Sequence, residues 1–293
     1  MVRGGTMLAI VGGTGLYQLD ELTMTEWRSV DSPFGRPSDQ LLFGKLHGQD
    51  VVFLPRHGRG HRIPPHEINF RANIDALKRA GATAVISVSA VGSLRSELAP
   101  GTFVVVDQFI DRTLRTPKTF FGTGLVAHVS MAHPTCRRMV ADIAAAGEEL
   151  GLPCQKGGSY LVMEGPQFSS LAESRMHIGL GCDVIGMTNM PEAKLAREAE
   201  LCYATIAMVT DFDCWHPDHD HVQVSDVIQV MHANSANAKR LLSHVIPRLA
   251  RFTEPCPHGC DRALEQAVLT APEARDPELV AKLGAVAGRV LRR

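Results

Sequence analysis

Two carboxylates follow a hydrophobic segment of the sequence, in the stretch Thr210-Asp-Phe-Asp-Cys-Trp215. Asp211 and Asp213 are two residues apart, so they share one face of an extended backbone, and a bend could turn both toward one ligand. Paired acids can belong to an ordinary loop, but an unpaired carboxylate beside a buried strand is unfavourable. Acids in such surroundings often belong to functional sites. We therefore interpret this pair as a candidate catalytic site.

A cluster of basic residues marks a second candidate site, in Leu54-Pro-Arg-His-Gly-Arg-Gly-His61. The planar guanidinium group of arginine suits phosphate oxygens, and a histidine adds a hydrogen-bond donor. A metal site built from His57, His61 and His66 is the poorer interpretation, because the neighbouring arginines would repel a cation. Taken alone, the segment fits a solvated basic loop equally well.

A glycine-rich turn near the N-terminus is a third candidate, in Ile10-Val-Gly-Gly-Thr-Gly15. The backbone N–H groups of such a turn, together with the Thr14 hydroxyl, can hold an anion. The turn is not the dinucleotide fingerprint, which would need a glycine at Gln18. A plain tight turn explains the glycines as well as a phosphate site does.

Three further segments place small or polar residues at the end of a predicted strand. They are Ser87-Val-Ser-Ala-Val-Gly-Ser93, Met163-Glu-Gly-Pro-Gln-Phe-Ser-Ser170 and Gly186-Met-Thr-Asn-Met-Pro-Glu192. In open α/β sheets, ligands bind at the carboxyl ends of the strands. Each segment alone fits a simple connection between a strand and a loop, but together they point to one binding site.

Hydrophobic patterning predicts the elements that hold these segments. Short runs rich in β-branched residues, typical of strands, occur at 7–11, 51–54, 84–91, 103–106, 184–187 and 205–210. They alternate with amphipathic stretches at 67–80 and 137–150. This alternation predicts an α/β fold with a central parallel or mixed sheet flanked by helices.

Signals for helix ends refine these expectations. Pro134 is expected in the first turn of the helix at 137–150. A long helix is predicted to follow Ser225 and to end near Pro247. Asp276-Pro277 provides an N-cap and a first-turn proline for a terminal helix.

The composition is that of an ordinary globular protein, with 45% apolar and 21% charged residues in a chain of 293. The net charge of −1 lacks the basic excess that nucleic-acid binding requires. No segment approaches the roughly 18 apolar residues of a membrane span, and the run at 7–11 is too short for a signal-peptide core. We therefore expect a cytoplasmic protein that binds neither nucleic acid nor a membrane.

Seven cysteines, an odd number, suggest individual thiols in a reducing compartment rather than a disulfide framework. Cys256 and Cys260 have a spacing that could form a disulfide or half of a zinc site. Because no second pair with metal-ligand spacing lies nearby in the sequence, no metal site is predicted. The stretch of mixed histidine and aspartate at 216–221 is interpreted as a solvated loop.

Taken together, these motifs resemble those of the trimeric purine nucleoside phosphorylase superfamily, over roughly residues 8–249. Within the superfamily, the sequence is similar to the members that cleave 5′-methylthioadenosine. The resemblance implies a single α/β domain at 1–251 with a mixed, partly barrel-like sheet, and the tail at 252–293 is expected to be a helical extension packed on it. The motifs that carry the resemblance are Gly12-Gly-Thr-Gly15, Arg56-His-Gly-Arg59, Asp107-Gln-Phe-Ile-Asp-Arg-Thr113, Glu164-Gly-Pro-Gln-Phe-Ser-Ser170, Met187-Thr188 and the acidic segment 210–215.

The resemblance also implies roles for individual residues. The residues implied to bind phosphate are Thr14, Arg56, His57, Ser89, Ala90 and Thr188, with Ser89 standing where the family often has threonine. The residues implied to bind the nucleoside are Phe168, Ser169, Met187, Asp211, Asp213, His128, Val224 and Val227, with His128 reaching a neighbouring subunit's site. A homotrimer, or a hexamer formed by two trimers, follows from the family. Inorganic phosphate is then a co-substrate, and no cofactor is expected.

The implied reaction is phosphorolysis, in which phosphate attacks C1′ of a nucleoside and releases a purine, as in purine and methionine salvage. A phosphate dianion can stabilise an oxocarbenium-like transition state. A carboxyl group with a raised pKa, for which Asp211 is the candidate, can protonate N7 of the departing base. Carboxylates accept hydrogen bonds from a 6-amino group, whereas a 6-oxo group would be repelled. Asp211 and Asp213 therefore favour adenine as the base.

Two alternatives remain at this point. The first is a phosphorylase that acts on adenosine or on 6-oxopurine nucleosides such as inosine, guanosine or methylthioinosine; an asparagine in place of one acid would favour the 6-oxopurines. The second is a non-catalytic module that senses adenosine derivatives. It would not need the phosphate ligands, yet the sequence retains all of them.

Overall fold

The computed structural model describes residues 7–13, 16, 18–217, 224–252 and 254–292. The strands of this part are β1 (Met7–Gly12), β2 (Leu22–Arg28), β3 (Leu41–Leu46), β4 (Gln49–Pro55), β5 (Ala82–Ser93), β6 (Phe103–Val106), β7 (Gln108–Asp111), β8 (Cys154–Lys156), β9 (Ser159–Val162), β10 (Val184–Gly186) and β11 (Cys202–Asp211). The α-helices are α1 (Phe70–Arg79), α2 (Arg137–Glu149), α3 (Leu171–Gly179), α4 (Asn189–Glu198), α5 (Val224–Leu249), α6 (Pro277–Lys282) and α7 (Gly288–Leu291). None of the helices described is long and apolar enough to cross a membrane.

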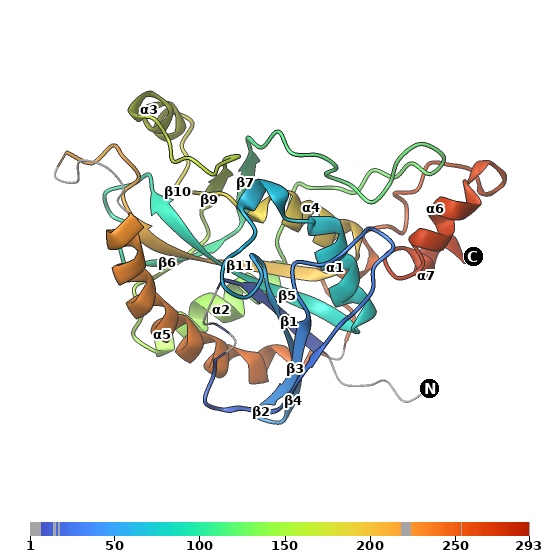
Figure 1. Ribbon diagram of the computed structural model, residues 1–293, viewed down its shortest axis with the longest axis horizontal. Coiled ribbons are helices and arrows are strands. Elements are labelled where there is room, and N and C mark those ends of the chain that lie inside the picture. The colour runs from blue at the N-terminus through green and yellow to red at the C-terminus, as the bar shows by residue number, and fades with distance from the viewer. Residues whose placement is uncertain (1–6, 14–15, 17, 218–223, 253, 293) are drawn as a thin grey trace.

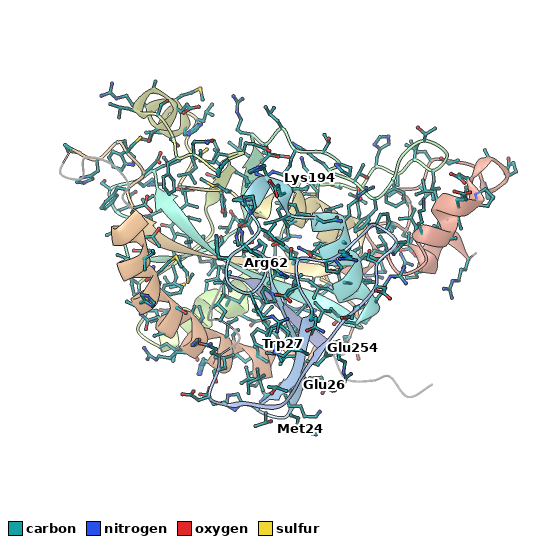
Figure 2. The ribbon with its side chains drawn as sticks, viewed as in Figure 1. Met24, Glu26, Trp27, Arg62, Lys194 and Glu254 are labelled. Carbon is teal, nitrogen blue, oxygen red and sulfur yellow. The ribbon has the colours of Figure 1, made fainter. Side chains whose placement is uncertain are left out.

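The strands form one mixed sheet of eleven strands in the described part of the chain. β5 is its centre, because it pairs in parallel with β1 and β11 and in antiparallel with β10. β2, β3 and β4 extend the sheet beyond β1, while β6 and β8 extend it beyond β11. Met24 and Glu26 mark the solvent-exposed edge at β2, at the opposite side of the view from Lys194 of α4 (Figure 2). The predicted α/β class with a mixed central sheet is therefore confirmed.

Both faces of the sheet are covered, because alternate side chains of a strand point to opposite faces. Ala9 and Val11 of β1 join a core that includes residues of α1 and α4. Leu8 and Ile10 of the same strand join a second core that includes residues of α2 and α5. The two helix layers lie on either side of the sheet in Figure 1. Strands buried on both faces need continuous hydrophobic runs, which is why the sequence reveals them.

The predicted strand runs lie within strands of the structure apart from Met187, which follows β10, and three helix starts differ from expectation. α5 begins at Val224, so Ser225 lies inside the helix rather than before it. α1 begins at Phe70 rather than at Glu67, because the Asn69 side chain caps it by accepting a hydrogen bond from the Ala72 N–H at 3.1 Å. α2 begins after its N-cap Cys136, so Pro134 lies before the helix, and its placement in the first turn was wrong. Asp276 caps α6 as predicted, by accepting from the Glu278 N–H at 2.9 Å.

The C-terminal segment packs against the same core as the central strands. Leu264, Leu283 and Val286 are buried together with residues of β1 and β5. The segment also pairs with the chain around Val126–His128, where the His128 N–H donates to the Ala267 carbonyl at 2.9 Å. Arg289 of α7 forms an ion pair with Glu200 at 2.6 Å. The division of the chain at residue 251 stays a prediction.

Candidate active site

A cavity of about 280 Å3 opens where β5, β10 and β11 end. This position is the one expected for ligands of an α/β sheet. Many of the residues singled out in the sequence lie on its wall: Arg56, His57, Ser89, Ala90, Phe168, Met187, Thr188, Asp211 and Asp213. The strand-end segments and the basic segment are thus brought together as predicted.

The other candidates lie elsewhere or cannot be placed. Ser169 is not on the cavity wall, although its carbonyl accepts a hydrogen bond from the Cys214 thiol beside the acid pair. Thr14 lies outside the described residues. Val224 and Val227 belong by their backbone to the first turn of α5, whose residues Met231 and Ser235 line the cavity, but their side chains are not described.

His128 does not line this cavity. It lies beside two other hollows of the surface, one of which it shares with Lys118, Lys194 and Glu198. His128 therefore takes no part in the cavity of its own chain as the structure describes it. A role in a neighbouring subunit's site stays a prediction.

A buried ion pair forms the floor of the cavity at the end of β4. The Arg56 and Glu192 side chains are each only 1% exposed, and the Arg56 Nε donates to Glu192 Oε2 at 2.8 Å. Glu192 Oε1 also accepts from the Ser87 hydroxyl at 2.7 Å and from the Tyr203 hydroxyl at 2.8 Å. Burial lowers the pKa of Arg56, but the Glu192 carboxylate offsets that effect and holds the pKa above its ordinary value. Arg56 is therefore charged, and the Glu192 carboxyl group is the counter-ion that its burial requires.

These contacts leave one N–H of Arg56, a residue of the cavity wall, without a partner in the described part of the chain. Besides the bonds to Glu192, Arg56 Nη1 donates to the Val88 carbonyl at 3.1 Å, and Nη2 is shared among Val11, Ser87 and Glu192. Among the described residues, the second Nη1 N–H has no acceptor. Because a guanidinium has five N–H groups in a fixed plane, this remaining donor has a fixed direction.

Two hydroxyl groups complete the polar end of the cavity. Ser89 Oγ donates to Asn189 Oδ1 at 3.2 Å, and the Thr188 hydroxyl contacts the same oxygen at 3.5 Å. The Asn189 amide is held in turn by Tyr203 and Thr205, each at 2.7 Å. Asn189 therefore fixes the positions of the two hydroxyls from behind.

His57 adds a ring nitrogen to this end of the cavity. Its Nδ1 lies 2.9 Å from the Ile63 carbonyl, which can only accept, so Nδ1 carries a proton. Burial, together with the nearby Arg56 charge, lowers the pKa of His57 to about 4. At pH 7 the ring is therefore neutral, and the lone pair of its Nε2 can accept a hydrogen bond from a protonated phosphate oxygen.

The acid pair forms another part of the wall. Asp211 ends β11, and Asp213 has a left-handed backbone conformation with φ of 52°, which bends the chain after the strand. Burial raises the pKa of both carboxyl groups. Both oxygens of Asp211 accept hydrogen bonds, from the Thr210 hydroxyl at 2.7 Å and from the Asp213 N–H at 2.8 Å.

Asp213 differs from Asp211 in one respect. Its Oδ2 is buried and has no hydrogen bond of good geometry within the described residues, although the nearby Ser174 and Ser169 hydroxyls oppose the rise of its pKa. A buried polar atom without a partner is rare in native proteins and calls for an explanation. The unpaired oxygen fits a ligand that donates a hydrogen bond at this point of the wall.

From the sequence we did not single out three residues that support the site: Glu192, Asn189 and Arg115. Glu192 and Asn189 fall inside a segment noted for its position after a strand, but nothing in that segment indicates which strands they contact. Arg115 carries no motif signal. Its guanidinium nevertheless ties three distant segments together, by donating to the carbonyls of Pro65 at 2.9 Å, Met187 at 3.0 Å and Glu164 at 2.7 Å.

Glu192→Gln should lower the free energy of unfolding by about 3–5 kcal/mol, because it leaves the buried Arg56 charge without its counter-ion. Urea denaturation monitored by circular dichroism measures the change. Glu97→Gln is the matched control, since Glu97 pairs with Arg95 at the exposed surface and its loss should leave stability nearly unchanged. Equal, small effects of the two substitutions would contradict this account of the cavity floor.

The sequence of this chain is similar to those of several phosphorylases. The chain is 56% identical over 287 residues to the S-methyl-5′-thioadenosine phosphorylase of Cereibacter sphaeroides, covering 98% of this chain and 99% of the relative. It is 58% identical over 286 residues to the enzyme of the same name from Bradyrhizobium diazoefficiens, with 98% of each chain covered.

Solved structures agree as well. A methylthioadenosine phosphorylase from an Antarctic soil metagenomic library superimposes with a TM-score of 0.91 at 44% identity, covering 97% of this chain and 99% of that one. The methylthioadenosine phosphorylase of Schistosoma mansoni, solved in complex with adenine, has a TM-score of 0.80 at 35% identity, covering 87% of this chain and 95% of that one. The phosphorylase superfamily model matches residues 7–247. The resemblance seen in the sequence is thus confirmed, and this chain belongs to the phosphorylase superfamily.

Proposed function

We propose that this protein is a pentosyltransferase that catalyses the phosphorolysis of 5′-methylthioadenosine by inorganic phosphate, giving adenine and 5-methylthioribose 1-phosphate. The observation that carries the proposal is the arrangement of the cavity wall, where an anion-binding group and a buried acid pair face one space. The names of the relatives and neighbours support the same reaction and the same nucleoside.

Phosphate would bind at the polar end, which matches its chemistry. The remaining Nη1 donor of Arg56 would donate to its oxygens, and the hydroxyls of Ser89 and Thr188 would turn their single O–H from Asn189 Oδ1 to phosphate. The Ala90 backbone and Thr14 would be further ligands. His57 Nε2 would accept a hydrogen bond from the protonated oxygen of phosphate, and the proton would stay on phosphate. Because Glu192 neutralises Arg56, binding relies on directed hydrogen bonds more than on net charge.

Phosphate and the acid pair would supply the nucleophile and the proton that the reaction needs. A phosphate oxygen forms a bond to C1′ while the bond from C1′ to N9 breaks, and that electron pair passes to the purine. The developing positive charge on the sugar lies next to the phosphate. Asp211, whose pKa burial raises, would supply the proton to N7, and we propose that the reaction needs no metal or organic cofactor.

The acid pair and the neighbouring loops would select the substrate. Asp213 Oδ2, the unpaired oxygen, would accept a hydrogen bond from the 6-amino group of adenine. Phe168, which is 46% exposed, and Ser169 would lie against the base, and Met187 would contact the ribose. Val224 and Val227 would form the apolar surroundings of the methylthio group.

We also propose how the subunits assemble and which cellular process the reaction serves. His128 would reach the 5′ group in a neighbouring subunit, so the active form would be a homotrimer, alone or paired as a hexamer. The reaction would serve purine and methionine salvage in the cytoplasm. The partners would then be small molecules and further copies of this chain, with no nucleic acid or membrane involved.

Phosphate dependence is the direct test of this function. With methylthioadenosine as substrate, adenine release should require phosphate and should be almost absent in phosphate-free buffer. Thr188→Val should raise the KM for phosphate more than the KM for nucleoside, whereas the exposed control Thr23→Val should change neither. Rapid adenine release without phosphate would indicate a hydrolase, and binding without turnover would indicate a sensing module.

Asp213→Asn tests the assignment of the base. Loss of a charge-assisted hydrogen bond of about 1.5–3 kcal/mol should lower kcat/KM for methylthioadenosine by about 10- to 150-fold. The new amide N–H can donate to a 6-oxo group, so kcat/KM for methylthioinosine should rise or fall much less. Asp50→Asn, at the exposed surface, is the control. An unchanged preference for adenine would mean that Asp213 does not contact the 6-position.

Subunit mixing tests the trimer. His128→Ala should weaken binding of the nucleoside, and Thr188→Ala should weaken phosphate binding. If each site combines Thr188 of one subunit with His128 of the next, mixing the two variants under subunit exchange should regenerate some intact sites and raise activity above that of either variant. A fully active monomer in light scattering, or no gain on mixing, would refute the shared site.

A further inference from the structure

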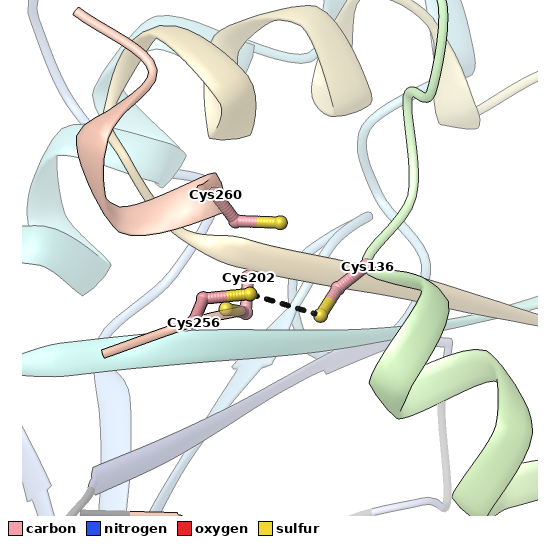
Figure 3. Close-up of side chains that lie close together, drawn as sticks. All are labelled: Cys136, Cys202, Cys256 and Cys260. Carbon is pink, nitrogen blue, oxygen red and sulfur yellow. Dashed lines mark hydrogen bonds between the residues drawn. The ribbon is translucent and has the colours of Figure 1, made fainter. Parts of the chain in front are cut away.

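Four cysteine side chains meet away from the cavity, in the interior of the molecule (Figure 3). They are Cys136, Cys202, Cys256 and Cys260, all buried, and their sulfur atoms lie within 4.8 Å of one another. None of them lines the cavity assigned to the reaction. The expectation of no metal rested on the sequence, in which no second pair with metal-ligand spacing lies near Cys256 and Cys260. In the folded chain, Cys136 and Cys202 lie beside them.

The spacing of the sulfur atoms fits one tetrahedral metal ion. With a zinc–sulfur bond of about 2.3 Å, two thiolates of a tetrahedral site lie about 3.8 Å apart. The Sγ atoms of Cys136 and Cys256 are 3.7 Å apart. A cluster of several irons would need room for its own iron and sulfide atoms between the thiolates, and sulfurs this close together enclose a single ion.

The backbone around the four cysteines is held by contacts independent of any metal. Cys256 and Cys260 flank a turn in which Gly259 has φ of 67° and its N–H donates to the Cys256 carbonyl at 2.9 Å. The Cys256 N–H donates to Asp261 Oδ2 at 3.0 Å. Their spacing of three intervening residues lies within the range usual for zinc sites. The turn therefore presents both sulfurs to the same point.

The second pair comes from two secondary-structure elements. Cys136 is the N-cap of α2, and its N–H donates to the Tyr203 carbonyl at 2.7 Å, which ties it to the strand that begins at Cys202. A thiolate at a helix N-terminus is stabilised by the free N–H groups of the first turn. Three separate parts of the chain thus contribute ligands to one point.

We propose that these four cysteines bind one zinc ion as a tetrahedral, structural site. Each thiol would release its proton to solvent as its sulfur bonds to the metal, with no change of oxidation state. Since the protein supplies all four ligands, no position remains for water or substrate, and the site is structural rather than catalytic. Four soft thiolates in a tetrahedron favour zinc over harder divalent ions.

The position of the site suggests what the metal does. It joins the segment after α5 to the start of α2 and to β11, so it anchors the C-terminal segment to the central sheet. That segment pairs with the chain at Val126–His128, where the Leu269 N–H donates to the Val126 carbonyl at 2.9 Å. Zinc would therefore stabilise the surface that carries His128 without entering the reaction.

Metal analysis of the full-length protein tests the proposal. Protein purified with a reducing agent and without chelators, then given zinc and desalted, should contain about one zinc per chain. Cobalt in place of zinc should give the absorption of a tetrahedral thiolate complex. Cys260→Ser and Cys256→Ser should lose most of the zinc, whereas Cys182→Ser and Cys154→Ser, outside the cluster, should retain it.

Several results would overturn the proposal, even if the substituted proteins fail to fold. The reduced wild-type protein could take up no zinc, or it could contain iron instead. Mass spectrometry could show that the four cysteines of freshly isolated protein form two disulfides. Zinc retained by both cluster variants would place the metal elsewhere. Each readout is independent of adenine release, so it can fail while the proposed function holds.

Discussion

The active-site region depends on a single buried ion pair, between Arg56 at the end of β4 and Glu192 in α4. A buried guanidinium is tolerated only with a counter-ion and with partners for its N–H groups. Glu192 is the counter-ion, and the Val88 carbonyl and the Ser87 hydroxyl accept hydrogen bonds from the guanidinium. Glu192 needs its own donors, and Tyr203 of β11 supplies one. The pair thus fixes the distances among α4 and three strands. The segment before Glu192 carries Met187 and Thr188, so the same constraint sets the cavity wall.

The acid pair, unlike the ion pair, consists of two carboxyl groups that have no cationic partner in an ion pair within the described residues. Burial raises the pKa of both carboxyl groups, so the folded protein favours their protonated forms more than water does. The protonated fraction falls as the pH rises through the raised pKa, and a reaction that needs this proton slows in the same range. Asp211 has both oxygens occupied and Asp213 does not. Each part of the wall thus has one group without a partner among the described residues, an N–H of Arg56 and an oxygen of Asp213, and we propose that phosphate and the purine base bind there.

The sequence predicted the fold well where the signal was local. Strands buried on both faces appear as uninterrupted hydrophobic runs, so β5, β6 and β11 could be located, and the functional segments follow the strand ends. The exposed strand β2 has no such run and was missed. Glu192 and Arg115 were missed as supporting residues because their partners are distant in the chain. The cysteine cluster was missed for the same reason, since Cys136 and Cys202 have no metal-ligand spacing of their own.

In the reaction that we propose, phosphate bound beside Arg56 and Thr188 is the nucleophile that attacks C1′. The most direct measurement is the fate of oxygen when the protein cleaves methylthioadenosine with ordinary phosphate in water enriched in the heavy oxygen isotope. Mass spectrometry and phosphorus NMR would identify the sugar product. Our account predicts methylthioribose 1-phosphate whose bridging oxygen comes from phosphate and carries no solvent label. Free methylthioribose labelled at C1′ by solvent oxygen would contradict it.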